Sequence, residues 1–177
     1  MCLAQIQAAT GFTVPQFKAH SAGLFEEVGV ALAQADEARL QRLTTPSCFE
    51  TMRPALRSRP KGQRHSWTSH GVVSSIKQIR VGFSSSDRER KFAQVTCAIE
   101  AQMVYEIHDT AGKLVGSTGS AATPHSLTDI WVFERMLAPG GAWRLKERLG
   151  SLEELSEASC GAAKQEGAGA SPPTGAR

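Results

Sequence analysis

Residues 129–149 read DIWVFERMLAPGGAWRLKERL, and this stretch decides the fold. It contains two runs in which apolar and polar side chains alternate, separated by the segment APGG. A period of two is typical of a half-buried β-strand, and adjacent proline and glycine residues are typical of a turn. The stretch therefore predicts a β-hairpin with one apolar face and one polar face.

The first strand of this hairpin should bury its aromatic side chains. Trp131 and Phe133 are two residues apart, so they share one face of the strand and can both pack against helices. Glu134 and Arg135 follow them on opposite faces. We expect Glu134 to form a cross-strand pair with Arg144 of the second strand, worth roughly 0.2–1 kcal/mol.

The second strand should combine an apolar row with a basic row. Trp143 and Leu145 would face the same core as the aromatic residues of the first strand. The basic residues that alternate with them are Arg144, Lys146 and Arg148. We therefore expect this strand to present a basic outer edge that could contact phosphate or lipid headgroups.

Upstream of the hairpin, residues 92–108 form the clearest strand pattern. Odd positions from Val95 to Ile107 carry apolar or aromatic side chains, and several even positions carry glutamate, glutamine or threonine. One face of this strand should be buried and the other solvated. Weaker strand patterns cover residues 65–83 and 114–120.

Helical periodicity comes before these strands. Residues 14–36 repeat apolar side chains at helical spacing, with Pro15 in the first turn. Asp36 is expected to cap a second helix, and a third should begin at Pro46 and end at the loop of residues 58–63. Helices followed by a meander of strands predict an α+β fold, in which N-terminal helices pack on a curved antiparallel sheet of about five strands.

The length of 177 residues suits one domain with extensions. We expect residues 1–13 to form an irregular N-terminal arm and residues 14–149 to form the α+β domain. Residues 150–177 should begin with a short acidic helix and continue as a tail rich in Ala, Gly, Ser and Pro. That composition cannot bury enough apolar surface to fold alone.

Basic residues are concentrated in one part of the chain. No acidic residue occurs between Glu50 and Asp87, whereas seven Lys or Arg residues do, so this span carries +7 in a chain of net charge +3. Such a concentration suits a polyanion, either nucleic acid or an anionic membrane surface. His65 and Trp67 could stack on an unpaired base, or Trp67 could belong to the core. The expected contact residues are Arg53, Arg57, Arg59, Lys61 and Arg64, together with Arg144, Lys146 and Arg148.

The sequence offers little for catalysis or metal binding. The four cysteines have no C-x-x-C spacing, so we expect Cys48 and Cys97 to be buried small side chains in a reducing compartment. The scattered candidates for proton transfer are His70, Tyr105, His108, Asp109, His125 and Asp129. No nucleophile elbow or phosphate-binding loop accompanies them, and no apolar run approaches the ~20 residues that span a bilayer. We expect no enzyme activity, no cofactor, no metal and no small-molecule substrate.

The motif Trp131-Val-Phe-Glu-Arg135, a short Pro/Gly loop and Gly141-Ala-Trp-Arg-Leu145 resemble the pattern of a mitochondrial domain family. Residues 31–52, ALAQADEARLQRLTTPSCFETM, also resemble the family's two helices and the acidic break between them. One member tethers the protein-import motor to the presequence translocase. Another is a large-subunit protein of the mitochondrial ribosome, near the polypeptide exit site and facing the inner membrane. The order Phe-Glu-Arg, then Gly-x-Trp-Arg, is closer to the ribosomal member.

This resemblance implies a cone-like domain of the nuclear-transport-factor type, with a pocket between helices and sheet. It implies a structural component of the mitochondrial large ribosomal subunit in the matrix. Its partners would be mitochondrial rRNA and other large-subunit proteins, with contact to the inner membrane left open. The alternative is a peripheral inner-membrane tether of the import motor, and the fold leaves a pocket enzyme or small-ligand binder as a further alternative.

Overall fold

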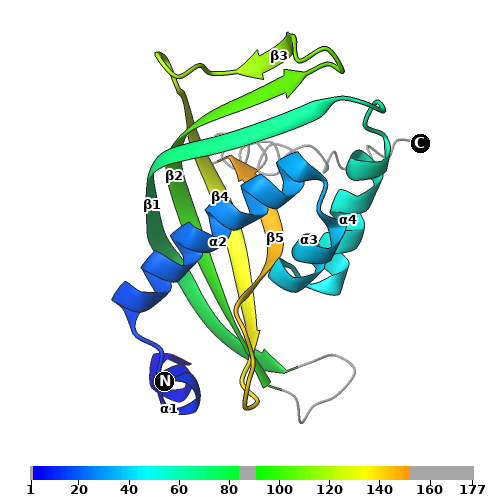
Figure 1. Cartoon of the computed structure of the whole chain (residues 1–177). Coiled ribbons are helices and arrows are strands. Elements are labelled where there is room, and N and C mark those ends of the chain that lie inside the picture. Colours follow the sequence, from blue (N-terminus) through cyan, green and yellow to red (C-terminus); the bar gives the residue numbers. More distant parts are fainter. Residues whose placement is uncertain (1, 84–90, 152–177) are drawn as a thin grey trace, which may run out of the picture.

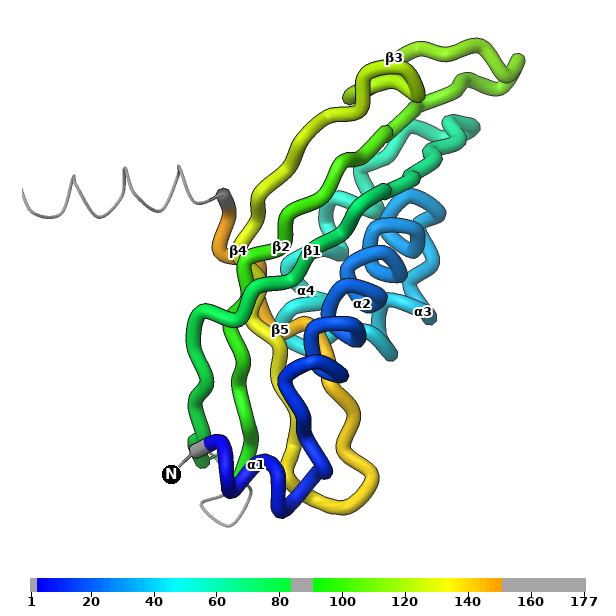
Figure 2. Tube along the Cα trace, turned by 90° about the vertical axis from the view of Figure 1, so that its left-hand side faces the viewer, coloured from blue at the N-terminus to red at the C-terminus, as the bar shows by residue number. Residues whose placement is uncertain are grey.

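The computed structural model describes residues 2–83 and 91–151, and within them four helices precede five strands. The elements are α1 (Cys2–Thr10), α2 (Val14–Gln34), α3 (Glu37–Leu43), α4 (Pro46–Arg57), β1 (Arg64–Phe83), β2 (Lys91–His108), β3 (Leu114–Thr118), β4 (His125–Met136) and β5 (Arg144–Ser151). Figure 1 shows α2 crossing the sheet diagonally, with α3 and α4 beside β5. In the side view of Figure 2 the sheet is curved and these three helices lie on one side of it. The predicted α+β fold class is confirmed.

The sheet has the strand order β1-β2-β4-β5 with antiparallel neighbours, and β3 pairs with the end of β2. Cys97 of β2 lies opposite Trp131 of β4, and Val95 lies opposite Phe133. Leu145 of β5 continues this row beside Phe133. Residues directly opposite each other share a face of the sheet, so these side chains form one continuous inner surface.

The core lies between α2 and this inner surface of the sheet. Phe25 of α2 packs on Trp131 with ring centroids 5.0 Å apart, and Phe17 packs edge-on against Phe133 at 5.8 Å. Trp143 extends the cluster, with its ring centroid 4.8 Å from that of Phe17. Apolar burial and aromatic packing therefore hold the longest helix on the sheet.

Polar caps determine where three of the helices begin. Thr13, Asp36 and Thr45 each accept a hydrogen bond from the backbone N–H three residues further on. These bonds satisfy amides that have no partner within the helix. The predicted cap at Asp36 is confirmed, and Pro15 and Pro46 occupy first-turn positions where their missing N–H costs nothing.

The prediction of an irregular N-terminal arm is wrong. These residues form α1, in which Ile6 is fully buried, and Phe12 packs against Phe17 and Trp143 at 5.4 and 6.0 Å. Leu3 and Ile6 are the large apolar side chains in a run of Ala and Gln, which gives little periodicity, so packing of Ile6 on the domain stabilises this helix. The predicted acidic helix and tail, residues 152–177, lie outside the described residues.

Gly29→Ala is expected to destabilise the protein, although alanine favours helices. An ideal Cβ at Gly29 would lie 2.5 Å from two ring atoms of Trp67, a ring that also packs against Phe25 with 5.7 Å between centroids. Overpacking of this kind costs about 1–3 kcal/mol, which outweighs a helix-propensity gain of about 0.8–1 kcal/mol. Urea unfolding should show the loss as a lower midpoint with an unchanged slope.

Gly23→Ala is the matched control for this substitution. Gly23 lies in the same helix, and no atom lies within 4 Å of its ideal Cβ. We expect this variant to gain up to about 1 kcal/mol from helix propensity. If the urea midpoints of both variants shifted by the same amount in the same direction, Trp67 would not constrain Gly29.

Candidate functional site

The connection between α4 and β1 presents three cations to solvent. Arg57 ends α4, Lys61 lies in the loop and Arg64 begins β1, and all three are exposed. Gly62 turns the loop with a φ of +85°, a conformation that favours glycine. Within residues 2–83 and 91–151, no carboxylate forms an ion pair with any of these three side chains. We call them the α4–β1 basic loop, a group able to contact phosphate oxygens.

Two other arginines of the predicted contact set are engaged within the protein. Arg53 pairs with Glu50 at 2.9 Å, lies 4.0 Å from Glu37, and covers the Phe49 ring at 5.0 Å. Arg59 donates from Nη1 to the Ala33 carbonyl at 2.9 Å and is only partly exposed. The structure therefore separates these two from the α4–β1 basic loop, although all five lie close together in sequence.

The predicted basic row on β5 is interrupted by a β-bulge. Val132 pairs with Glu147 whereas Phe133 pairs with Leu145, so Lys146 is an extra residue on β5. The alternation reverses after the bulge, and Arg148 lies opposite Trp131 on the inner face. Of the three residues in the predicted row, Arg144 and Lys146 thus remain on the outer face and Arg148 does not.

Glu134 pairs with a different residue from the one expected. It lies opposite Arg144 in the register, but its carboxylate binds the Lys146 Nζ at 2.8 Å and accepts a hydrogen bond from Gln94 Nε2 at 2.8 Å. The bulge places Lys146 within reach of the carboxylate. The next residue, Arg135, faces the start of α2. Burial lowers the pKa of His20 there, Glu27 opposes this shift, and the charge of Arg135 adds to the lowering.

Asp129 is a buried carboxylate on the inner face of β4. Its side chain is 1% exposed and accepts hydrogen bonds from the Ile130 backbone N–H at 3.0 Å and from Trp131 Nε1 at 2.9 Å. Arg148 completes the set by donating from Nε. Three donors compensate the burial of this charge, so Asp129 anchors other side chains and is not a free base.

A cavity of about 270 Å³ lies between α2 and the sheet, beside Asp129. Phe25, Trp67 and Trp131 provide aromatic walls, and Arg59 and Arg148 also line it. Two distant segments, the α4–β1 loop and the end of β5, thus each bring an arginine to one cavity. Sequence reasoning assigned both arginines to an outer surface, because neither the bulge nor the bond to Ala33 is visible in the residue pattern.

His65 and Trp67 are not displayed for stacking on a base. The ring of Trp67 packs edge-on against Phe25 on the inner face, so the alternative in which it belongs to the core is the correct one. His65 hydrogen-bonds the Tyr105 hydroxyl through Nδ1. Partial burial, and then the charge of Arg59, lower the pKa of His65.

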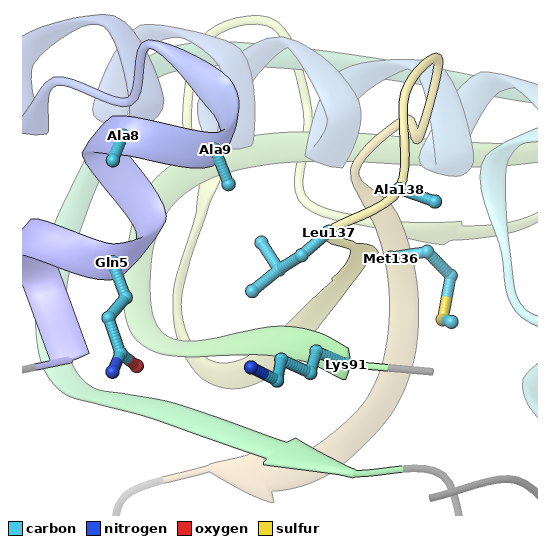
Figure 3. A pocket seen from close by; sticks show the side chains of 7 residues that line it. All are labelled: Gln5, Ala8, Ala9, Lys91, Met136, Leu137 and Ala138. Atoms are coloured by element: carbon cyan, nitrogen blue, oxygen red, sulfur yellow. The ribbon is translucent and has the colours of Figure 1, made fainter. Parts of the chain in front are cut away.

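A further hollow lies between α1 and the β4–β5 hairpin. Figure 3 shows Gln5, Ala8 and Ala9 of α1 on one side, with Leu137 and Lys91 extending toward them. This groove of about 950 Å³ is mostly apolar. It contains no cluster of polar groups that would define a reaction or a ligand.

Cys48 and Cys97 are small buried side chains, as expected. Cys48 and Cys97 are 4% and 0% exposed. Burial, with Glu147 adding to it, raises the pKa of the Cys48 thiol to about 11, and burial also raises the pKa of Cys97. In the part of the chain that the structure describes, no three His, Cys, Asp or Glu side chains are grouped to hold a metal ion. None of the described helices is long and apolar enough to span a bilayer.

The chain is similar to known proteins over most of its length. The chain is 27% identical over 140 residues to the bovine (Bos taurus) large ribosomal subunit protein mL45. That alignment covers 78% of this chain but 44% of the relative, so the chain spans less than half of the relative's length. Among solved structures, the intermembrane space region of the chloroplast protein ARC6 aligns with a TM-score of 0.46 and 13% identity, over 75% of this chain and 95% of that one. The pattern of the Tim44-like domain matches residues 3–149, so the chain belongs to the Tim44-like domain family.

Proposed function

We propose that this protein is a structural component of the mitochondrial large ribosomal subunit. The observation that carries the proposal is the similarity to mL45, which extends over 78% of the chain. The family match supports a structural or tethering role and does not point to catalysis. The arrangement of Asp129 agrees with this view, because its carboxylate is already bound by three donors.

The α4–β1 basic loop is the surface we assign to rRNA. Arg57, Lys61 and Arg64 come from consecutive segments, are exposed, and lie in a span without acidic residues. Such cations bind phosphates and the shape of the RNA backbone rather than its sequence. Arg144 is exposed too, but β5 begins at the hairpin end of the sheet, away from this loop (Figure 1). We therefore assign it to a separate contact with a neighbouring protein or phosphate.

We further infer a position in the matrix, near the polypeptide exit site and facing the inner membrane. The resemblance of the β4–β5 hairpin to the ribosomal member of the family supports this position. Anionic headgroups could contact the same cations, each contributing about 1 kcal/mol near the membrane surface. The second candidate function, a peripheral tether of the import motor, has the support of the family match alone.

Sedimentation of a mild mitochondrial lysate on a density gradient distinguishes these two functions. We expect the chain to migrate with the large ribosomal subunit and to remain there at moderate salt. Migration with membranes alone, or release from an organellar chaperone on addition of ATP, would contradict the ribosomal assignment. The peripheral tether of the import motor would then be the better-supported function.

Replacement of Arg57, Lys61 and Arg64 together by glutamine should weaken binding to extracted mitochondrial large-subunit rRNA. Each phosphate contact contributes about −0.7 to −0.9 to the slope of log K against log salt, so losing three should flatten the slope by about 2–3. Filter binding at several salt concentrations measures this slope. Circular dichroism should be unchanged, because the three side chains make no described ion pair.

The matched control replaces Lys18, Lys91 and Lys113 by glutamine. These lysines are exposed and lie outside the acid-free span, so the control removes the same net charge from other surfaces. We expect its slope to stay close to that of the unmodified protein. Equal flattening in both variants would mean that total charge, and not the α4–β1 basic loop, governs RNA binding.

A further inference from the structure

We propose that the cavity between α2 and the sheet binds a compact organic monoanion that has a flat apolar body and one carboxylate or similar acidic group. This ligand site is independent of the proposed RNA contact, because the α4–β1 basic loop does not line the cavity. The inference rests on the walls of the cavity, its charges and its size.

The walls of the cavity suit a flat apolar body. Phe25 and Trp131 are 2% and 5% exposed and their rings pack together, while Trp67 faces them from β1. Leu127 and Met103 complete the apolar lining. Aromatic and aliphatic walls with a few fixed polar groups are what small-molecule sites have in common.

The charges that line the cavity leave an excess of one positive charge. Arg59 and Arg148 contribute two positive charges and Asp129 one negative charge. Asp129 already accepts three hydrogen bonds, one of them from Arg148, so it is neutralised where it lies. Arg59 uses Nη1 on the Ala33 carbonyl, and among the described residues no carboxylate pairs with it. This guanidinium is thus held in place with donors to spare for an anion.

The indole of Trp67 directs its N–H group toward α2. Its Nε1 atom is buried and has no hydrogen-bond partner among the described residues. Buried donors are nearly always satisfied, and leaving one unpaired costs about 1–3 kcal/mol. An ideal Cβ at Gly29 would lie 2.5 Å from Nε1, so this atom abuts α2, and it is the ring of Trp67 that contributes to the cavity wall.

Size and access limit the class of ligand. A volume of about 270 Å³ lies just below the usual range for ligand sites and equals the space of roughly nine water molecules. This volume suits one or two rings. A groove of about 580 Å³ between α4 and β5 shares Leu32, Trp131 and Arg148 with the cavity, and the Arg148 side chain is 56% exposed. A ligand would enter from this groove, past Arg148.

The test compares 2-naphthoate with its uncharged counterpart 2-naphthamide on the full chain. Isothermal titration calorimetry gives the affinities, and the indole N–H resonance of Trp67, assigned with Trp67→Phe, reports the site. We expect saturable binding of naphthoate, a shift of that resonance, and binding of the amide at least about tenfold weaker, equivalent to 1.4 kcal/mol. Arg59→Gln should weaken the binding of naphthoate by a similar factor and leave the affinity for the amide unchanged.

Two further variants separate the effect from folding and from overall charge. Arg57→Gln removes a nearby exposed cation that does not line the cavity, and it should bind naphthoate as the unmodified protein does. Arg59→Lys keeps the charge and should retain part of the affinity if Arg59→Gln proves poorly folded. The proposal is overturned if naphthoate shows no saturable binding below about 1 mM, if the amide binds equally well, or if Arg59→Gln and Arg57→Gln behave alike.

Discussion

Phe133→Ala is expected to lower the free energy of unfolding by about 3–5 kcal/mol, the usual cost of emptying a fully buried aromatic site. Phe133 is 0% exposed and lies where the helical and sheet layers meet. Its ring contacts Phe17 edge-on at 5.8 Å and lies 6.1 Å from Trp131. The surrounding side chains belong to three different strands and α2, so they cannot easily collapse into the space. Chemical denaturation monitored by far-ultraviolet circular dichroism measures the loss.

Phe83→Ala provides a control with the same chemical change. Phe83 ends β1 and is 57% exposed, so its removal should change the free energy of unfolding by less than about 0.5 kcal/mol. A comparable loss in both variants would argue against a core centred on Phe133. A domain of this size has a net stability of roughly 5–15 kcal/mol, so the Phe133 variant should remain folded but marginal.

Asp129→Ala should be the second most damaging substitution, with a loss of about 2–3 kcal/mol. It would leave the buried Trp131 Nε1 without an acceptor and would remove the partner of Arg148. Breaking a fully buried ion pair costs about 3–5 kcal/mol. We expect the smaller loss of about 2–3 kcal/mol here because the Arg148 side chain is 56% exposed. Thermal unfolding at neutral pH provides the measurement.

Asp129→Asn tests whether geometry or charge dominates this site. The amide keeps an acceptor for the Trp131 indole but loses the charge that pairs with Arg148, so we expect a loss of about 1–2 kcal/mol. The indole N–H resonance of Trp131 should stay near its original position in the Asn variant and move in the Ala variant. Equal stability of the Ala variant and the unmodified protein would contradict the role of Asp129 as an anchor.

The elements of the fold could be predicted because their signals are local. The alternation in residues 92–108 and in the hairpin gave β2, β4 and β5, and Asp36 marked the start of α3. These predictions depend on periodicity and on side chains that bond their own backbone, both of which a sequence displays directly. The α1 helix was missed because packing of Ile6 against the domain, and not a repeating pattern, stabilises it.

The sequence predicted which stretch of the chain is basic, and the tertiary structure decided which of its charged side chains are exposed. The acid-free span drew attention to Arg57, Lys61 and Arg64, which are exposed, and their contact with rRNA stays a prediction. The same composition could not reveal that Arg59 would bond a carbonyl of α2. Residues adjacent in sequence share a composition but not an environment, because contacts across 26 residues of chain are made only in the folded protein.

The sequence by itself determined the α+β class, the order of helices and strands and the concentration of positive charge before and within β1. Only the tertiary structure decided which residues of the basic row on β5 face outward. The extra residue Lys146 in that strand reverses which of the following side chains face inward, and this turns Arg148 from an expected surface cation into a partner of buried Asp129. A bulge depends on how two strands pair, so alternation within one strand cannot predict it.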